Sequence, residues 1–288
     1  MSVLRIDHLE KNFGTNLALG GISFAVEKGE IFGFLGPNGA GKSTTLRCIM
    51  DYIRPSKGWV TVFDKDSQAD AAELKRRIGY VPSEPNLYGQ WTVDEHIKFA
   101  GRLQTIDSTR AAELKHDLQL DGHKKVRQLS TGNQQKLAII LALIHQPELL
   151  LLDEPTRGLD PLLRATMHDI LRAYQKDGGT VLLSSHDLSE VEELCTNLAI
   201  IRAGKIVTDS SVDKLKQANI HNIKVRFAGK LPNLSALGLN NLEVNGQTAS
   251  FTLKGDINKM LDALTRYPVL DLEVTKASLD DVFMEIYA

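Results

Sequence analysis

A glycine-rich segment that follows an apolar run carries the strongest chemical signal in the chain. Its residues are Gly36, Pro37, Asn38, Gly39, Ala40, Gly41, Lys42, Ser43 and Thr44. They match in full the phosphate-binding loop (P-loop) pattern Gly-x-x-x-x-Gly-Lys-Ser/Thr. The glycines let backbone N–H groups face one concavity, which together with a helix N-terminus favours a triphosphate. In such a loop Lys42 reaches the β- and γ-phosphates and the Ser43 hydroxyl ligates Mg²⁺.

Two acidic residues stand where a second apolar run ends. Asp153 and Glu154 follow Leu149 to Leu152, which fits a strand buried in a parallel sheet. Ligands of α/β folds bind at the carboxyl ends of such strands. By itself an Asp-Glu pair there is usually a solvated strand end. In a chain with a P-loop, Asp153 is predicted to hold Mg²⁺ through water and Glu154 to polarise the attacking water.

Alternating strands and helices are expected to position these residues. Glu30 to Leu35 is a nearly continuous apolar run that leads into the loop, and the helical stretch Thr45 to Tyr52 follows it. The same alternation returns later, with expected strands at Leu149 to Asp153, Thr180 to Ser184 and Leu198 to Arg202, and expected helices at Leu162 to Lys176 and Leu188 to Cys195. This order predicts an α/β fold whose parallel sheet is covered by helices on both faces.

Two further regions accompany that core within residues 1–215. Val3 to Leu9 and Ile22 to Val26 alternate apolar and polar residues, as strands of an antiparallel edge do. Residues 84–146 are expected to form a helical insertion. Helical spacing occurs there in Val93 to Leu103, Thr109 to Leu120 and Ser130 to Gln146.

Residues 216–288 are expected to form a second, smaller domain. Asn245-Gly246 between two short apolar runs is a good hairpin signal. Ile257 to Arg266 has helical spacing, Val269 to Val274 has the pattern of a strand, and a last helix is expected from Leu279. The pattern predicts a small α+β domain with no obvious catalytic group.

Composition and charge narrow the class of protein. The 288 residues are 42% hydrophobic and 24% charged, the balance of an ordinary globular protein. The chain has 34 Lys and Arg against 36 Asp and Glu, and a formal net charge of -2 gives no support to a general nucleic-acid binder. No apolar run approaches the ~20 residues needed to cross a bilayer. A role at a membrane is therefore expected from the cytosolic side, through a partner.

A second motif separates the classes that use a P-loop, which include kinases, GTPases and motor ATPases. It precedes Leu149 and consists of Leu129, Ser130, Thr131, Gly132, Asn133, Gln134, Gln135 and Lys136. Here the chain resembles the ABC ATPases, whose signature motif reads Leu-Ser-Gly-Gly-Gln. Taken alone, the stretch is equally compatible with an ordinary serine N-cap. The resemblance covers residues 1–209 and implies a P-loop NTPase core with an antiparallel β subdomain and a helical insertion.

The resemblance also implies roles for single residues. In that family the signature helix of one subunit points its N-terminus at the γ-phosphate held by the other, and Ser130 and Gly132 match those positions. Asp160 matches the acid of a loop that crosses the dimer interface. His186 resembles the switch histidine that reaches the γ-phosphate and the attacking water, and Phe13 resembles the aromatic residue that stacks on adenine. Without the resemblance, His186 would be interpreted as structural and Phe13 as an edge-strand core residue.

Taken together, these matches imply an ATP-binding and ATP-hydrolysing subunit of an ABC transporter, with Glu154, His186 and Lys42 as its catalytic residues. Two subunits, identical or different, would pack head to tail around two Mg-ATP. A polytopic membrane permease would be the partner, which places the chain in the cytoplasm on the inner face of the cell membrane. The ending from Ala277 to Phe283 resembles the extension of drug- and antibiotic-export subunits and favours export. An amphipathic surface helix is the alternative for that ending.

One residue departs from the family pattern, and two other classes of protein remain as alternatives. The family usually places glutamine where Ser83 stands, so coupling of hydrolysis to transport is the least certain part of the resemblance. A soluble ABC protein acting on ribosomes or DNA is disfavoured, because the chain has one P-loop and one signature. A nucleotide sensor that does not hydrolyse ATP is disfavoured because Lys42, Asp153, Glu154 and His186 are all present.

Overall fold

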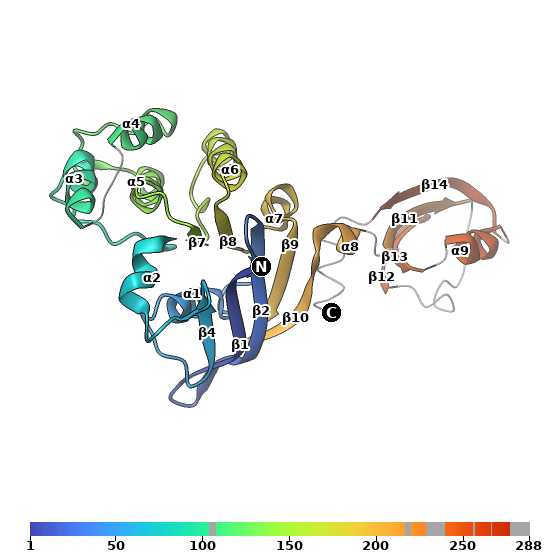
Figure 1. Cartoon of the computed structure of the whole chain (residues 1–288). Coiled ribbons are helices and arrows are strands. Elements are labelled where there is room, and N and C mark those ends of the chain that lie inside the picture. The colour runs from blue at the N-terminus through green and yellow to red at the C-terminus, as the bar shows by residue number, and fades with distance from the viewer. Residues whose placement is uncertain (104–107, 217–219, 229–239, 256, 266, 277–288) are drawn as a thin grey trace. The chain divides into compact units, whose positions relative to one another are not determined.

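Two sheets with a helix packed between them form the larger of two units in the chain (Figure 1). The computed structural model describes residues 1–103, 108–216, 220–228, 240–255, 257–265 and 267–276. Unit 1 comprises Met1–Ser210 and unit 2 comprises Ser211–Ala288. The boundary predicted from the sequence was at residue 215.

The first sheet of unit 1 is antiparallel along its length. Its strands, in spatial order, are β2 (Asn16–Glu27), β1 (Ser2–Phe13), β4 (Lys57–Val62) and β5 (Lys65–Asp66). The expected strands Val3 to Leu9 and Ile22 to Val26 were too short, because pairing continues to the hairpin where Phe13 faces Asn16. Register shifts along β1 and β2 break the strict alternation on which the prediction rested.

The second sheet of unit 1 holds the strands that end at the predicted site. Its order is β10 (Lys205–Ser211), β9 (Asn197–Arg202), β3 (Ile31–Leu35), β8 (Thr180–Ser185), β7 (Leu149–Asp153) and β6 (Ile78–Val81). The pairs β3–β8, β3–β9, β7–β8 and β6–β7 are parallel. Every residue of β3, β7 and β8 is buried, as expected for parallel strands covered on both faces.

Helices cover the parallel sheet on both faces. On one face α1 (Lys42–Ile49) shares a hydrophobic core with both sheets, and Phe24 of β2 stacks on Phe32 and Phe34 of β3 at ring-centroid distances of 5.6 and 5.0 Å. Gly33 lies between those two phenylalanines and faces the opposite way, toward Val191. That second face is covered by α6 (Pro161–Lys176) and α7 (Leu188–Leu194).

The helical insertion is present, and it packs against the edge of the parallel sheet. Its elements are α3 (Val93–Leu103), α4 (Ser108–Asp117), the 3₁₀ turn η1 (Val126–Gln128) and α5 (Thr131–Leu143). Helix α5 contacts α3 and α4 on one side and β6 on the other, and the three helices lie together at one end of unit 1 (Figure 1). Strands β4 and β6 and helix α2 (Ala71–Arg77) were not predicted from the sequence, and β6, with four residues, is too short for a periodic signal.

Unit 2 is a small α+β domain, as predicted. After α8 (Val212–Lys216), its antiparallel sheet has the order β12 (Asn240–Asn245), β13 (Thr248–Lys254), β11 (Ile220–Phe227) and β14 (Val269–Lys276). Helix α9 (Ile257–Leu264) packs Met260 and Leu264 against Val225, Phe227 and Phe251 of this sheet. The helix expected from Leu279 and the motif from Ala277 to Phe283 lie outside the described residues.

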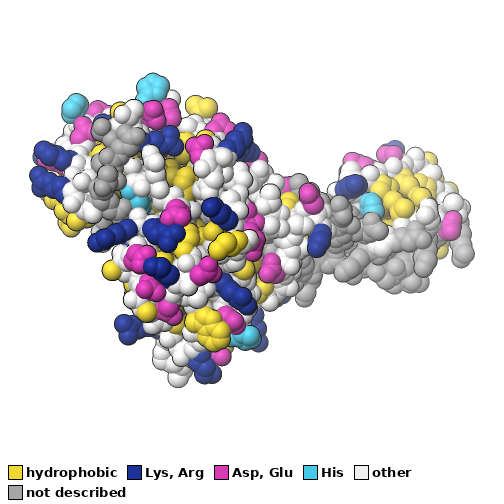
Figure 2. All heavy atoms as spheres, viewed as in Figure 1, with side chains coloured by type: hydrophobic (Ala, Val, Ile, Leu, Met, Phe, Trp, Pro, Cys, Tyr) yellow, Lys and Arg dark blue, Asp and Glu magenta, His cyan; other side chains and the backbone are white. Residues whose placement is uncertain are grey.

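The surface of unit 1 is mixed in charge. On the face drawn in Figure 2, Lys and Arg side chains are interspersed with Asp and Glu side chains. Among the described residues, no helix has the length and apolar character that a membrane crossing requires. The predicted fold class is confirmed: an α/β core with an antiparallel subdomain and a helical insertion, followed by a small α+β domain.

Candidate functional site

The loop between β3 and α1 is a tight turn that requires glycine at two positions. Gly41 precedes α1 with a φ of 115°, in the left-handed region, and a Cβ there would lie 2.9 Å from the carbonyl oxygen of Ala18. A Cβ on Gly36 would lie 2.4 Å from the carbonyl oxygen of Ile201. Because Gly41 begins the helix, α1 starts at Lys42 rather than at the expected Thr45. No side chain caps α1, so its first N–H groups are suited to an anion.

A pocket of about 310 Å³ opens over this loop. It is lined by Phe13, Asn16, Leu17, Ala18, Pro37, Asn38, Gly39, Gly41, Lys42, Ser43, Thr44 and Glu154. The pocket therefore joins the β1–β2 hairpin, the P-loop and the end of β7. Gly36 and Ala40, also predicted to bind the ligand, are buried parts of the loop and do not line the pocket.

Lys42 crosses the loop from the first turn of α1. Its Nζ donates to the carbonyl oxygens of Gly36 at 2.5 Å and Pro37 at 3.2 Å. The same ammonium lies 3.3 Å from Oε1 of Glu154, and the lysine side chain is 5% exposed. A buried cation is thereby fixed at the wall of the pocket, where it complements a phosphate.

Glu154 lies between two groups that carry or can carry positive charge. Its Oε1 is 3.3 Å from Lys42 Nζ and 3.3 Å from Nδ1 of His186. The backbone of Glu154 has a φ of 50°, which is costly for a residue with a side chain, and its N–H donates to the carbonyl of Ser184 at 3.1 Å. His186 is half exposed, whereas the Glu154 side chain is 10% exposed. The turn after β7 thus brings together the three residues predicted to be catalytic.

Asp153 is buried at the end of β7 with one carboxylate oxygen satisfied and one not. Ser184 Oγ donates to Oδ1 at 2.7 Å, and Oδ2 has no hydrogen-bond partner among the described residues. Burial, and then the negative charge of Asp153, raises the pKa of Tyr80 to about 12. An unpartnered carboxylate oxygen at a strand end fits a cation ligand.

The described residues hold no cluster of three or more His, Cys, Asp or Glu that could bind a metal by itself. The unpartnered oxygen of Asp153 and the hydroxyl of Ser43 fit Mg²⁺, which is usually bound by one or two side chains together with substrate phosphates. Ser43, the second predicted ligand, lines the pocket at the start of α1.

Ser130, Gly132 and Asp160 lie at helix starts outside the pocket lining. Ser130 is the N-cap of α5, and its Oγ accepts from the N–H of Asn133 at 3.3 Å. A Cβ on Gly132 would come within 3.3 Å of the Gly158 carbonyl oxygen, so the start of α5 lies against the loop before α6. Asp160 caps α6 by accepting from the N–H of Leu163 at 2.9 Å.

Several residues that contact the predicted ones were not predicted from the sequence. Ser184, which supports both Asp153 and Glu154, carried no signal beyond its place at the end of an expected strand. Asn16, Leu17 and Ala18 line the pocket because β2 begins as early as Asn16. A longer second strand would have been the signal for these three residues.

Comparison with known proteins decides the family. The model of the ABC transporter family matches residues 19–157. The Nod factor export ATP-binding protein I of Burkholderia orbicola (strain AU 1054) is 32% identical, over 99% of this chain and 98% of its own. The chain belongs to the ATP-binding proteins of ABC transporters. The fluoroquinolones export ATP-binding protein of Mycobacterium tuberculosis (strain CDC 1551 / Oshkosh) is 35% identical to this ABC protein, over 93% of this chain and 87% of its own.

Solved structures agree with this assignment. The structure of an ATP-binding subunit of an ABC transporter superposes with a TM-score of 0.70 and 26% identity, covering 75% of this chain and 92% of that one. As an ABC ATPase, the protein binds and hydrolyses ATP. The predicted family and activity are therefore confirmed, and kinases, GTPases, motor ATPases and a sensor without hydrolysis are excluded.

Phe13 provides a test of where the adenine binds. Its ring lies at the end of β1, is 50% exposed and lines the pocket, with Lys11 Nζ 5.0 Å from the ring centroid. We expect Phe13→Ala to weaken ATP binding about tenfold, since aromatic stacking contributes ~0.5–1.5 kcal/mol beyond burial. We expect the melting temperature to change little, because half of the residue is already exposed to solvent. Calorimetric titration with ATP and thermal unfolding measure the two effects.

Trp59→Ala is the matched control for Phe13→Ala. Trp59 is an aromatic residue on β4 of the same sheet, is 53% exposed and does not line the pocket. Its removal should leave ATP affinity unchanged. A Phe13→Ala protein that melts earlier but binds ATP normally would instead support the edge-strand core interpretation of Phe13.

Proposed function

We propose that two ABC ATPase subunits close around two Mg-ATP and drive export through a polytopic membrane permease. The observation that carries the proposal is the division of the site. Lys42, Glu154 and His186 meet at the pocket, whereas Ser130 and Gly132 begin a helix outside it. One subunit then supplies the P-loop face of each nucleotide, and a second subunit, identical or related, supplies the signature face.

Each residue of the P-loop face has a distinct task in this proposal. Phe13 stacks on the adenine, the N–H groups at the start of α1 hold the phosphates, and Lys42 neutralises the β- and γ-phosphates. Ser43 and Asp153 would hold Mg²⁺, which would neutralise charge that develops on the phosphates during transfer. Glu154 accepts a proton from the attacking water, and His186 orients that water and the γ-phosphate.

The signature face explains why nucleotide binding would close the dimer. Ser130 and the start of α5 present a hydroxyl, N–H groups and the positive end of a helix dipole. These groups interact with the γ-phosphate only when a second subunit brings one, so ATP favours the closed pair over the open one. Asp160, at the loop before α6, would contribute at the interface between the subunits.

The names of two relatives support export, and the location at the inner face of the cell membrane rests on the proposed permease partner. Both relatives, whose lengths this chain nearly spans, are named as export ATP-binding proteins. The closing and opening of the ATPase dimer would be transmitted through the helical insertion to the permease. Ser83, two residues after the end of β6, is half-buried and shorter than the glutamine that the family usually places there.

Affinity purification from membranes tests the proposed partner. We expect the tagged chain, solubilised in mild detergent, to recover a polytopic membrane protein in stoichiometric amount, as mass spectrometry would measure. The untagged chain in the same cells is the control. Recovery of ribosomal proteins, or of DNA, in place of a membrane protein would contradict the transport role and favour a soluble ABC protein acting on nucleic acid.

A further inference from the structure

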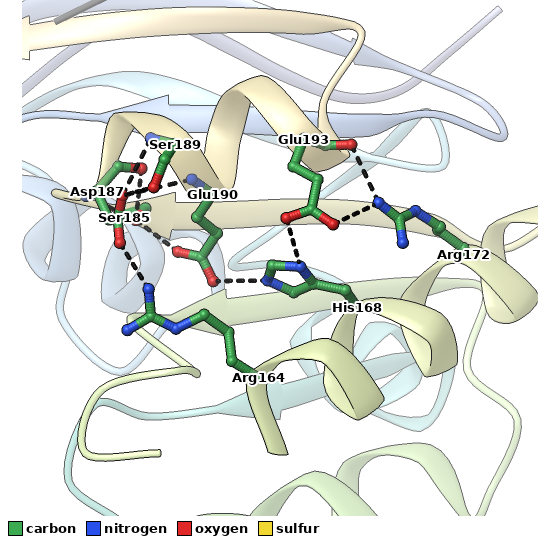
Figure 3. A network of polar contacts seen from close by, with 8 residues as sticks. All are labelled: Arg164, His168, Arg172, Ser185, Asp187, Ser189, Glu190 and Glu193. Carbon is green, nitrogen blue, oxygen red and sulfur yellow. Dashed lines mark hydrogen bonds and ion pairs between the residues drawn. The ribbon is translucent and has the colours of Figure 1, made fainter. Parts of the chain in front are cut away.

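A chain of polar contacts connects α6 and α7 beside β8, the strand that His186 follows. Figure 3 shows it with Arg164, His168 and Arg172 on α6 and with Glu190 and Glu193 on α7. The three α6 residues are spaced four apart, so they lie on one face of that helix. The chain is therefore built from one helix face and the facing side of the next helix.

The centre of this chain is a buried ion pair. His168 and Glu190 are each 2% exposed, and Nε2 of His168 lies 3.8 Å from Oε1 of Glu190. Neither of these two atoms has a hydrogen bond among the described residues, so each has the other as its polar partner. On its other side, Nδ1 of His168 lies 3.2 Å from Oε2 of Glu193. Removing one member of such a buried pair leaves an uncompensated charge, which is costly.

The same contacts hold both neighbours of His186. Ser185 Oγ donates to Oε2 of Glu190 at 2.6 Å and accepts from the N–H of Asp187 at 3.0 Å. Oδ2 of Asp187 lies 2.9 Å from a guanidinium nitrogen of Arg164. The backbone on either side of His186 is thereby tied to α6 and α7, while the imidazole itself is half exposed beside Glu154.

We propose that Glu190 and His168 are positioning residues, which hold Ser185 and Asp187 and so fix His186 in the geometry required for hydrolysis. The inference rests on the proposed role of His186. Neither residue lines the nucleotide pocket, so their effect is on the rate of hydrolysis and not on ATP binding. Because Asp160 caps the start of α6, the network also links the proposed interface loop to His186.

Protonation of His168 gives the network a recognisable pH dependence. Burial lowers the pKa of His168, but the carboxylates of Glu190 and Glu193 that face its two ring nitrogens more than offset it, so the net pKa lies above the usual 6.5. The other charged groups around it are Arg164, Arg172 and Asp169 of α6 itself and Asp187 at the start of α7. The ion pair is thus complete below 6.5 and is lost as the pH rises through that higher pKa.

Glu190→Gln is the first variant to test. The amide keeps the shape and can still accept from Ser185, but it removes the charge that faces His168. We expect kcat for ATP hydrolysis to fall about tenfold, with KM for ATP unchanged within about twofold. Loss of a general base itself lowers the rate by at least about a hundredfold, and a residue that only positions another should cost less. Asp169→Asn is the control, because that exposed acid lies on the same helix and contacts only Arg172 in the network.

Two further variants separate positioning from folding. Ser185→Ala removes the hydroxyl that donates to Glu190 and accepts from the N–H of Asp187, and we expect the same loss of kcat, measured at a temperature at which the variant is folded. His168→Lys keeps a positive charge to higher pH, so the alkaline decline in kcat should move to higher pH than in the wild type. These measurements use the full chain.

The His186→Ala background distinguishes this inference from the role of His186 itself. We expect His186→Ala to abolish most hydrolysis and Glu190→Gln to cause no further loss in it. An active His186→Ala protein would overturn the proposed role of His186, and the inference with it. An inactive His186→Ala protein, combined with a Glu190→Gln protein as active as Asp169→Asn, would overturn the positioning role alone. The positioning role would also be overturned if Glu190→Gln raised KM for ATP while lowering kcat. The same holds if the alkaline decline in kcat lay at the same pH in His168→Lys as in the wild type.

Discussion

Glu154→Gln will bind ATP as tightly as the wild-type protein and hydrolyse it at least about a hundredfold more slowly. Glutamine has the same size, so the turn after β7, with its φ of 50° and its hydrogen bond to Ser184, is preserved. The amide cannot take a proton from water. Lys42 and His186 both lie 3.3 Å from Oε1 of Glu154, and the amide oxygen of the glutamine can take the place of Oε1 between them. Phosphate release in a single turnover, and a calorimetric titration of ATP, measure the two quantities.

The same variant reports on the dimer. Because hydrolysis opens the proposed ATP-bound pair, Glu154→Gln in saturating Mg-ATP should accumulate as a dimer, as light scattering coupled to size-exclusion chromatography measures. Glu113→Gln is the control, since Glu113 is exposed on α4 and lies away from the pocket. A Glu154→Gln protein that stays monomeric under these conditions would contradict the closed nucleotide sandwich.

Contiguous motifs made much of the site predictable from the sequence. In the P-loop, Lys42, Ser43 and Gly41 act through the local backbone, which a short stretch of residues determines by itself. Asp153 and Glu154 were predictable because a buried strand must end at the same edge of the sheet as the P-loop. The position of these five residues depends on few long-range contacts beyond the order of the strands.

Contacts between distant segments were not predictable in the same way. Ser184 meets Asp153 because the register of β7 against β8 pairs these two residues, and neither strand's apolar pattern specifies a register. His168 and Glu190 meet because α6 and α7 cover the same face of the sheet. Periodicity placed each helix but did not determine how far each is rotated about its axis. Short elements such as β6 failed for a simpler reason, since four residues carry no period.

Lys42→Ala is expected to act on binding where Glu154→Gln acts on chemistry. A hydrogen bond to a charged group contributes ~1.5–3 kcal/mol, so the dissociation constant for Mg-ATP should rise roughly 10- to 100-fold. The loss should be near the upper end, because Lys42 is 5% exposed and already held by the carbonyls of Gly36 and Pro37. Its ammonium therefore needs little reorganisation to meet the phosphates. Calorimetric titration with ATP measures the change.

The alanine variant also removes the ammonium that lies 3.3 Å from Oε1 of Glu154, whereas the His186 imidazole, at the same distance from that oxygen, is kept. Any loss of stability from this source appears as a lower melting temperature without ATP, whereas loss of the phosphate contact appears as a smaller upward shift of that temperature on adding ATP. Lys57→Ala, which removes an exposed lysine paired with Glu10, controls for net charge. Unchanged ATP affinity in a folded Lys42→Ala protein would show that the loop backbone alone holds the phosphates, and would restrict Lys42 to the hydrolysis step.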